Sequence, residues 1–396
     1  MTRLLIVGAG PAGRALAHRV LVHGGDVILV DPDPHRPWTA TFGAFADDLP
    51  AWLAVDRVIA CAAPEFVVYT PTRRAVPRPY ATLSATGLQR ELDISGAETV
   101  AGHVTRVDAR AVILEDGRRL TADRVVDARG AWTDDPRIPR QTAYGTFHPT
   151  PEGRDPEMVL MDWRGAGVVA PSFSYRVDLG DGRTLVEETC LAGAPPVPLE
   201  VLAARNTDRA ESPGAADSAE PSAERVDFPL HPAQLPWHVP AADDRGVLRF
   251  GAGGGLMHPA TGYSIAGSLA AADEVAATIV RGDDPAALLW TTRARLVYRL
   301  RLIGLAVLLG FDGPGLAEFF DAFFRLTVRT QRAYLGGRDD LRGTTTAMWA
   351  VFRRLPAKQK ARLVTLTGRA LGRMVVRTPG PGRPGPRRSP SPRRAP

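Results

Sequence analysis

The chain has 396 residues, of which 44% are hydrophobic and 23% charged, and its formal net charge at pH 7 is +6. This length and composition allow a sizeable core, most simply in two interleaved domains, and they exclude a small or wholly disordered protein. The segment from Arg377 onward holds six arginines and no acid, so the net charge of the rest of the chain is near zero. The body of the protein therefore lacks the positive charge that is typical of nucleic-acid-binding proteins.

A glycine-rich segment near the amino terminus predicts a dinucleotide site. An apolar run at 3–7 predicts a strand, and the sequence Gly-Ala-Gly-Pro-Ala-Gly and a helical pattern follow at once. Such loops let the backbone approach a pyrophosphate, and the first amides of the helix face it. A second apolar run, 26–30, leads to an acid at the usual position for a ribose contact. A tight structural turn is the alternative. The expected contacts are Gly8, Gly10, Pro11, Ala12, Gly13 and Asp31.

The middle of the chain is rich in predicted strands. Residues 66–69 and 112–117 are typical of short strands, and 120–130 indicates a strand that returns to the nucleotide-binding sheet and ends in a turn at Gly130. Beyond residue 140 a strand-rich second domain is predicted, with a hairpin formed by 172–177 and 183–191.

Adjacent acids in the second arm of this hairpin are the strongest candidates for chemistry. Glu187 and Glu188 lie between apolar residues. Burial disfavours the charged form, and neighbouring carboxylates resist ionising together, so one of them is expected to keep its proton near neutral pH and act as a general acid. A solvated edge strand or a salt-bridged pair is the alternative. Alternation places Glu187 on one face with Leu185 and Thr189, and Glu188 on the other, so only one acid can face a given pocket.

A second glycine-rich loop follows a polar segment. Residues 205–224 are small and polar and predict a flexible surface excursion without chemistry. A strand at 246–250, a loop at 251–264 and a helix at 265–279 then repeat the arrangement that delivers amide groups to a ligand. A loop between packed elements is the alternative reading. His258 is expected to shape the loop rather than to catalyse. The loop residues expected at a cofactor are Gly253, His258, Pro259, Thr261 and Gly262.

The last hundred residues predict helices but no membrane span. The longest apolar stretch, 302–311, is too short to cross a bilayer. Arginines precede it, so the segment is predicted either to lie along a membrane surface or to be a buried helix with a solvated arginine face. The tail 377–396 is expected to be disordered, as a solubilising end or as a contact for anionic lipid. These arginines are Arg293, Arg295, Arg299 and Arg301.

Cysteine usage and the first residues indicate the compartment. Cys61 and Cys190 offer neither a disulfide framework nor metal-ligand spacing, so no metal site is expected and a reducing cytoplasm is favoured. Because the chain begins with a strand, no signal peptide is expected.

Several motifs in register resemble the lycopene cyclase family. Leu185-Val-Glu-Glu-Thr189 is similar to its Phe-Leu-Glu-Glu-Thr motif, with Leu and Val in place of Phe and Leu. Met158–Arg164 contains its Met-Asp-Trp-Arg segment, and His258–Tyr263 resembles its His-Pro-Ser-Thr-Gly-Tyr loop. Residues 141–145 and 171–175 also match, in the family's order. The likeness covers about residues 1–370, whereas the excursion and the tail look peculiar to this chain and the carboxy-terminal part follows the family only loosely.

Together, the motifs and the resemblance imply an α/β (α+β) fold. A Rossmann-like FAD-binding domain with a parallel sheet is expected from 1–65, 100–145 and 240–285. A β-sheet substrate domain from 66–99 and 146–239 is interleaved with it, and a helical region follows at 286–376, with a membrane-facing surface as one of its two interpretations.

The resemblance further implies a lycopene beta-cyclase, an isomerase that closes the acyclic ends of lycopene, or of a related acyclic carotenoid, into β-ionone rings, giving γ-carotene or β-carotene. In this scheme Glu187 donates the proton, Glu188 positions the strand or tunes that acid, and reduced FAD, primed by NAD(P)H, stabilises the carbocation. Peripheral contact with the cytoplasmic membrane is implied. A redox FAD enzyme of the geranylgeranyl reductase or monooxygenase type and a non-enzymatic lipid-binding protein are the alternatives.

Overall fold

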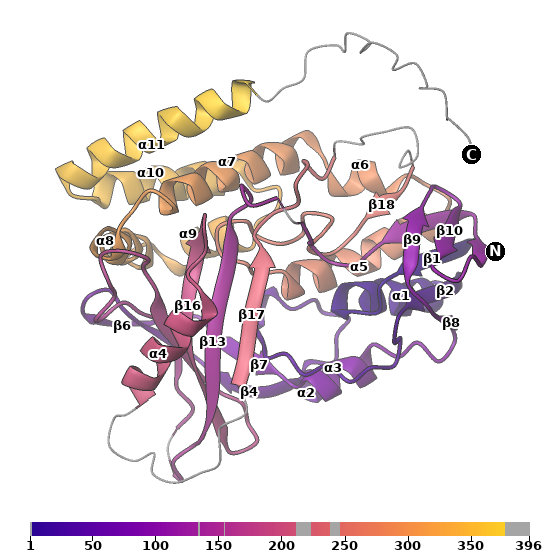
Figure 1. Cartoon of the computed structure of the whole chain (residues 1–396), viewed down its shortest axis with the longest axis horizontal. Coiled ribbons are helices and arrows are strands. Elements are labelled where there is room, and N and C mark those ends of the chain that lie inside the picture. Colours follow the sequence, from indigo (N-terminus) through magenta and orange to yellow (C-terminus); the bar gives the residue numbers. More distant parts are fainter. Residues whose placement is uncertain (1, 134, 154, 211–222, 238–245, 377–396) are drawn as a thin grey trace, which may run out of the picture.

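The computed structural model describes residues 2–133, 135–153, 155–210, 223–237 and 246–376. One of its two units is built on a five-stranded parallel sheet with the order β18-β12-β1-β2-β8 (Figure 1). The strands are β1 (Arg3–Val7), β2 (Asp26–Asp31), β8 (Glu98–Ala101), β12 (Arg124–Asp127) and β18 (Leu248–Arg249).

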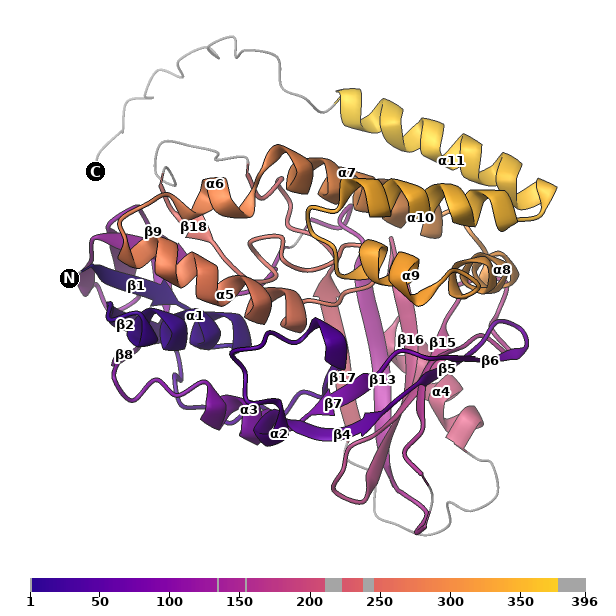
Figure 2. The same ribbon diagram turned by 180° about the vertical axis from the view of Figure 1, so that it is seen from behind.

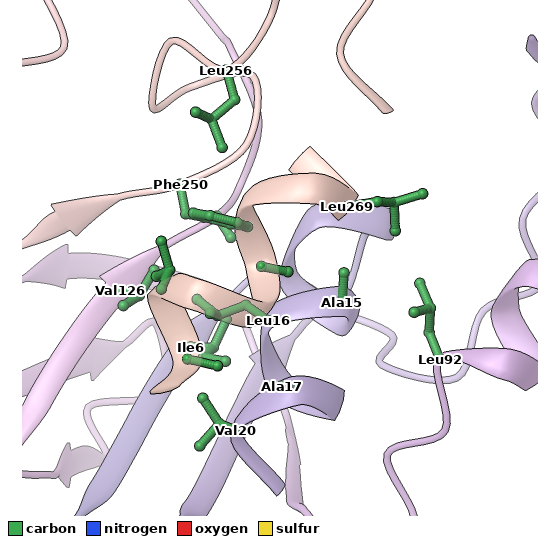
Figure 3. Packing of buried hydrophobic residues seen from close by; sticks show 14 of the residues in the cluster. Ile6, Ala15, Leu16, Ala17, Val20, Leu92, Val126, Phe250, Leu256 and Leu269 are labelled. Carbon is green, nitrogen blue, oxygen red and sulfur yellow. The ribbon is translucent and has the colours of Figure 1, made fainter. Parts of the chain in front are cut away.

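Both faces of this sheet are covered, which explains the continuous apolar runs of its strands. Leu4 and Ile6 pack under helices α1 (Pro11–Val22) and α5 (Ile265–Val280), in a cluster that Figure 3 shows from close by. Leu5 and Val7 belong to a second cluster on the opposite face. That face is covered by a small antiparallel sheet of β9 (Val104–Val107), β10 (Ala111–Leu114) and β11 (Arg119–Thr121).

The second unit is a seven-stranded sheet with the order β17-β13-β16-β15-β14-β5-β6. All its pairs are antiparallel except β14 with β5, and the acid-bearing strand β16 lies inside it, between β13 and β15. The strands are β5 (Phe66–Tyr69), β6 (Arg73–Val76), β13 (Arg140–Pro149), β14 (Met158–Asp162), β15 (Phe173–Asp178), β16 (Arg183–Gly193) and β17 (Ala223–Pro229).

Different elements cover the two faces of the seven-stranded sheet. Helix α4 (Leu199–Ala210) packs on β13 and β16, where Leu202 contacts the Cys190 face. The other face, with Phe173 and Leu185, shares a core with the carboxy-terminal helices (Figure 2). These helices are α7 (Thr292–Leu308), α8 (Gly313–Phe324), α9 (Val328–Leu335), α10 (Leu341–Arg354) and α11 (Ala357–Val376).

Short elements connect the two units. A three-stranded antiparallel sheet with the order β3-β7-β4 lies between them, and its strands come from the first hundred residues. These elements are β3 (Phe42–Phe45), η1 (Ala46–Asp48), α2 (Val55–Val58), β4 (Ile59–Ala63), β7 (Tyr80–Leu83), α3 (Ala85–Glu91) and α6 (Pro285–Leu289).

The arginine-rich segment before the longest apolar stretch is a core helix. In α7 the side chain of Arg301 is buried, and its Nη2 donates to the carbonyls of Tyr334 (2.7 Å) and Gly337 (3.1 Å). Burial lowers the pKa of Arg301 to about 10. Arg295 and Arg299 lie over the ring of Trp237. Within the described residues no helix is long and apolar enough to cross a membrane.

The mixed α/β fold class is confirmed, and two boundaries are corrected. Residues 205–210 end helix α4 and residues 223–224 begin β17, so the expectation of a flexible excursion over 205–224 is wrong at both ends. Backbone hydrogen bonding to β13 orders the second end, a long-range pairing that a polar composition does not reveal. The boundary placed at 145/146 runs through β13. The remaining residues of the excursion and the tail 377–396 lie outside the described residues.

Candidate active site

Glu187 lies at the centre of β16, on the sheet face that packs against the carboxy-terminal helices and the β3-β7-β4 sheet. Its direct neighbours are Tyr175 on β15 and Gly145 on β13. Leu185 and Thr189 share its face, as the alternation of the strand predicts, and Leu185 belongs to the apolar core on that side. The predicted orientation of this acid is therefore confirmed.

The Glu187 carboxyl group is almost completely removed from solvent. Its side chain is 9% exposed, and Thr189 Oγ1 donates to Glu187 Oε1 at 2.6 Å. The pKa of the Glu187 carboxyl is raised from 4.5 to about 7, because burial, the main cause, and the Glu224 carboxylate raise it by more than the hydrogen bond from Thr189 lowers it. An acid whose pKa lies near neutrality can both hold and release a proton under physiological conditions.

Glu188 points to the opposite face and is engaged in a polar network. Ser172 Oγ donates to Glu188 Oε1 at 2.5 Å, and Arg209 Nε on α4 lies 2.7 Å from Glu188 Oε2. Arg205 Nη1 donates to Ser172 Oγ at 2.6 Å. Burial raises the pKa of Glu188, whereas Ser172 and the arginines oppose the rise. Glu188 therefore ties β16 to α4 and to the start of β15, on the face of the sheet opposite to Glu187.

A chain of tyrosines joins the acid to the second glycine-rich loop. Tyr175, the cross-strand neighbour of Glu187, has its hydroxyl 3.2 Å from that of Tyr80 on β7, which lies 3.5 Å from the hydroxyl of Tyr263. Burial raises the pKa of all three phenols. Three segments far apart in the sequence supply these residues, and no local sequence pattern predicts their association.

The first glycine-rich loop has the shape of a phosphate cradle. Gly8 has φ +105° and packs against the backbone of Ala128, while a side chain at Gly13 would overlap the carbonyl of Gly8. A methyl group built on Gly10 meets no protein atom within 4 Å. Gly10 caps α1, and Pro11 occupies its first turn. The open side of Gly10 and the helix amides are thus free to receive an anionic group.

Loops from three adjacent parallel strands meet at this edge. β18, β12 and β1 are neighbours and run in the same direction, so their carboxyl ends lie together. A side chain at Gly253 would overlap the carbonyl of Gly130, and one at Gly251 would lie 2.6 Å from Ala12 Cβ. The structure therefore brings the predicted residues of all three loops together.

Asp31 ends β2 beside the same loop. Ala9 N donates to Asp31 Oδ2 at 2.8 Å, and Asp33 N donates to Oδ1 at 2.9 Å. The acid thereby fixes the first glycine-rich loop, and it stands where the sequence pattern predicts a ribose contact.

The loop 251–264 reaches from the cradle to the seven-stranded sheet. His258 is buried, Ala260 N donates to its Nδ1 at 3.2 Å, and its Nε2 lies 3.3 Å from the carbonyl of Tyr334. Burial lowers the pKa of His258 well below 6.5, and Arg301 lowers it further. The ring therefore shapes the loop, whereas Thr261 Oγ1 is buried without a hydrogen-bond partner among the described residues.

Gly262 closes the loop against β13. A side chain at Gly262 would overlap Gln141 Oε1, an atom that is also buried without a partner among the described residues. Gln141 and Gly145 lie on the same face of β13. Gly262, which contacts Gln141, and Glu187, which is paired with Gly145, are therefore on the same side of the sheet. Two unpartnered polar atoms at this junction suit a polar ligand.

Two hollows lie on the helical side of the molecule, and neither is lined by Glu187. One of about 710 Å³ is bordered by Asp48, Arg332 and Asp340. The other, of about 70 Å³, is apolar and is bordered by Val307, Phe323 and other residues of α7 to α11. No group of three or more metal-ligating side chains occurs within the described ranges.

Comparison with known proteins gives a consistent result. The model of a family described as lycopene cyclase protein matches residues 3–360. An uncharacterized carotenoid cyclase of Deinococcus radiodurans is 33% identical, with 88% of this chain and 89% of that protein covered. A chloroplastic lycopene beta cyclase of an Oncidium hybrid is 30% identical, with coverages of 85% and 78%. Among solved structures, a geranylgeranyl bacteriochlorophyll reductase-like protein of Thermoplasma acidophilum has the same fold, with a TM-score of 0.64, 14% identity and coverages of 93% and 99%.

Proposed function

The chain belongs to the lycopene cyclase family, and on this premise we propose that it is a lycopene beta-cyclase, which closes acyclic ends of lycopene or a related acyclic carotenoid into β-ionone rings. The observation that carries the proposal is the Glu187 carboxyl group, which is buried on an apolar sheet face and has a pKa raised to about 7. Protonation of an alkene needs such an acid, held where water does not compete for its proton.

Glu187 is the proposed proton donor. Its proton passes to the terminal double bond of the polyene, the neighbouring double bond attacks the carbocation, and loss of a ring proton completes an isomerisation without net oxidation. Thr189 supports this role because its hydrogen bond fixes the orientation of Glu187 Oε1. Glu188 is proposed to act as a positioning residue, since its contacts with Ser172 and Arg209 hold β16 in register.

FAD is the proposed cofactor, with NAD(P)H as its reductant. Three features of the chain fit a flavin dinucleotide: the open side of Gly10, the junction of Gly130 with Gly253, and the unpartnered oxygen of Thr261. The pyrophosphate would lie at Gly10, Pro11 and the following turn, and Asp31 would meet the ribose. When reduced, the flavin would supply negative charge close to the carbocation.

Peripheral membrane contact is proposed for the outermost helices, α10 and α11, because carotenoids partition into bilayers. Helix α11 lies at the edge of the helical region in Figures 1 and 2 and contains basic residues but no acid. Its Val364 and Leu371, seven residues apart on one face, are 59% and 47% exposed, and Trp349 of α10 is 61% exposed. Apolar and basic residues together are typical of helices at an anionic membrane surface.

Pigment analysis in lycopene-accumulating cells tests the proposal. Wild-type protein is expected to convert lycopene into γ-carotene or β-carotene, and Glu187→Gln is expected to yield no cyclic product although flavin stays bound. Glu200→Gln, the same change at an exposed residue of α4, is the matched control and is expected to retain activity.

Three results would contradict the proposal. Cyclic product from Glu187→Gln at the wild-type rate would remove the proposed donor. Consumption of one reduced nicotinamide per molecule of product would indicate a redox enzyme of the geranylgeranyl reductase or monooxygenase type instead. Absence of any pigment change, with tight binding of a prenyl lipid, would indicate a lipid-binding protein.

A further inference from the structure

A second carboxylate lies on the same sheet face as Glu187. Glu224 is the second residue of β17, and it is paired with Gly145 of β13, which is in turn paired with Glu187 of β16. Directly opposed residues of antiparallel strands point to the same side of the sheet. Glu187 and Glu224 therefore flank one glycine, two strands apart, at a backbone separation of about 10 Å.

Gly145 has no side chain, so the side chains of Glu187 and Leu185 pack directly over its backbone. A methyl group built on Gly145 would lie 3.2 Å from Glu187 Cβ and 3.4 Å from its Cγ, so the Glu187 side chain leans over the glycine. The same methyl group would lie 2.7 Å from Leu185 Cδ1. A larger residue here would collide with Glu187 and Leu185, whereas glycine lets the Glu187 side chain lie over the strand that separates it from Glu224.

Glu224 is only partly satisfied by its surroundings. Thr41 N donates to Glu224 Oε1 at 2.9 Å, which fixes the side chain from the segment before β3. Glu224 Oε2 is buried and has no hydrogen-bond partner among the described residues. A buried carboxylate oxygen without a donor is unusual, and a protonated carboxyl group on the other side of Gly145 would supply one.

The other ionisable groups around Glu187 are phenols. Tyr175 faces it from β15, Tyr80 from β7 stands behind Tyr175, and Tyr263 comes from the loop that carries Gly262. Arg78 acts on Tyr263 and is paired with Asp47 at 2.9 Å. In the described part of the chain Glu224 is the charged group that acts on Glu187, and its effect favours the protonated acid.

We propose that Glu224 is the charged partner of Glu187 and that the two carboxyl groups hold one catalytic proton between them. This inference rests on the proposed cyclase function and assigns to Glu224 the part of a positioning residue, which acts through Glu187. It also gives a role to a residue of the polar segment from which no chemistry was expected.

The pair accounts for both proton transfers of the cyclisation. In the first, the O–H bond of Glu187 breaks, a C–H bond forms at the polyene end and a carbocation results. The pair then carries two negative charges close together, which raises its affinity for a proton. In the second, a ring C–H bond breaks, its electrons form the ring double bond and the proton returns to the pair. Nothing is oxidised, and the enzyme ends with the single proton with which it began.

The pH profile of cyclisation by the flavin-loaded enzyme distinguishes this role from a structural one. Because the protonated form of Glu187 is active, activity is expected below its pKa and is lost above it. Glu224→Gln removes the charge that favours protonation, so the alkaline limb of kcat/KM should move to lower pH by about one unit, with a loss of about tenfold on that limb.

Asp227→Asn is the matched control. Asp227 also belongs to β17 and loses the same charge, but it points to the opposite face and pairs with Arg140. The alkaline limb of the kcat/KM profile of Asp227→Asn should coincide with that of the wild type. If the alkaline limb of the kcat/KM profile of Glu224→Gln stayed at the wild-type pH, the proposal would be overturned, even if the rate were lower. An equal displacement in Asp227→Asn would also overturn it, because the effect would then come from net charge.

Carboxyl ¹³C resonances of labelled glutamates provide a test that does not depend on activity or on the folding of a Glu224 variant. In the wild-type protein, the resonance that disappears in Glu187→Gln and a second glutamate resonance are expected to respond at the same pH, as coupled groups do. A Glu187 resonance that titrates alone would contradict the shared proton. If instead the wild type fails to cyclise lycopene while the coupled response is present, the proposed function fails and the carboxyl pair stands.

Discussion

Replacement of Glu187 by Gln is expected to remove activity and yet to stabilise the folded protein above neutral pH. The side chain is buried, and its pKa rises from 4.5 to about 7 on folding. At about 1.4 kcal/mol for each pKa unit, ionisation of this group inside the fold costs about 3 kcal/mol. Glutamine keeps the shape and the oxygen that accepts from Thr189, and it has no proton to lose.

The direction of the pH dependence follows from the raised pKa. Below about pH 4.5 the acid is protonated in both the folded and the unfolded chain, so it causes no loss of stability. As the pH rises, the unfolded chain ionises first, and the stability of the wild type falls until about pH 7, where the folded group ionises as well. The difference between variant and wild type should therefore grow from near zero at about pH 4 to about 3 kcal/mol at about pH 8.5.

Urea unfolding of both proteins at saturating FAD measures this difference, and Glu200→Gln serves as the exposed control, with no pH-dependent change expected. Ionisable groups that do not interact with Glu187 cancel in the comparison, which therefore isolates Glu187 and the groups coupled to it. If Glu187→Gln were no more stable than the wild type at about pH 8.5, or if the difference were the same at both pH values, burial would not hold the proton on this acid. The physical basis for its role as donor would then be lost.

Three further predictions concern the cofactor, the second acid and the membrane. Gly10→Val should fold with unchanged stability in the absence of flavin, because its side chain meets open space, and it should lose flavin absorbance on purification; retained stoichiometric flavin would contradict the cradle. Glu188→Gln should lower kcat but leave the alkaline limb in place, because this acid faces α4; a displaced limb in the pH profile would assign it to the proton path. Leu371→Glu should weaken binding to anionic lipid vesicles about tenfold or more in a sedimentation assay, while an unchanged affinity would place the contact elsewhere.

Structural features that depend on a few neighbouring residues could be predicted from the sequence. The first glycine-rich loop, the hairpin of β15 and β16 and the opposite directions of Glu187 and Glu188 follow from local periodicity and glycine spacing. Apolar neighbours also indicate an interior position for Glu187, with a solvated edge strand as the alternative, and the place of β16 inside the sheet decides for burial.

The partners of Glu187 could not be predicted in this way. Glu224 is 37 positions further along the chain, at the end of a polar segment whose composition indicates no strand, and only its pairing with β13 brings it to the acid. Tyr80 and Tyr263 come from a different sheet and from a loop, so their meeting with Tyr175 depends on how the two units pack. The helical segment before Phe311 is a related case, since only its contacts decide between core and membrane surface.

The position of the acid on an interior strand explains how one dipeptide provides two different environments. Alternation sends Glu187 toward the apolar face and Glu188 toward α4, where arginines balance its charge. Because the ladder fixes the register, a shift of one residue would exchange the two side chains and place the paired acid on the apolar face. The Glu188 network with Ser172 and Arg209 opposes such a shift. The second glutamate thus keeps the first on the apolar face through the strand register, while the charge of Glu224 favours the protonated form of Glu187.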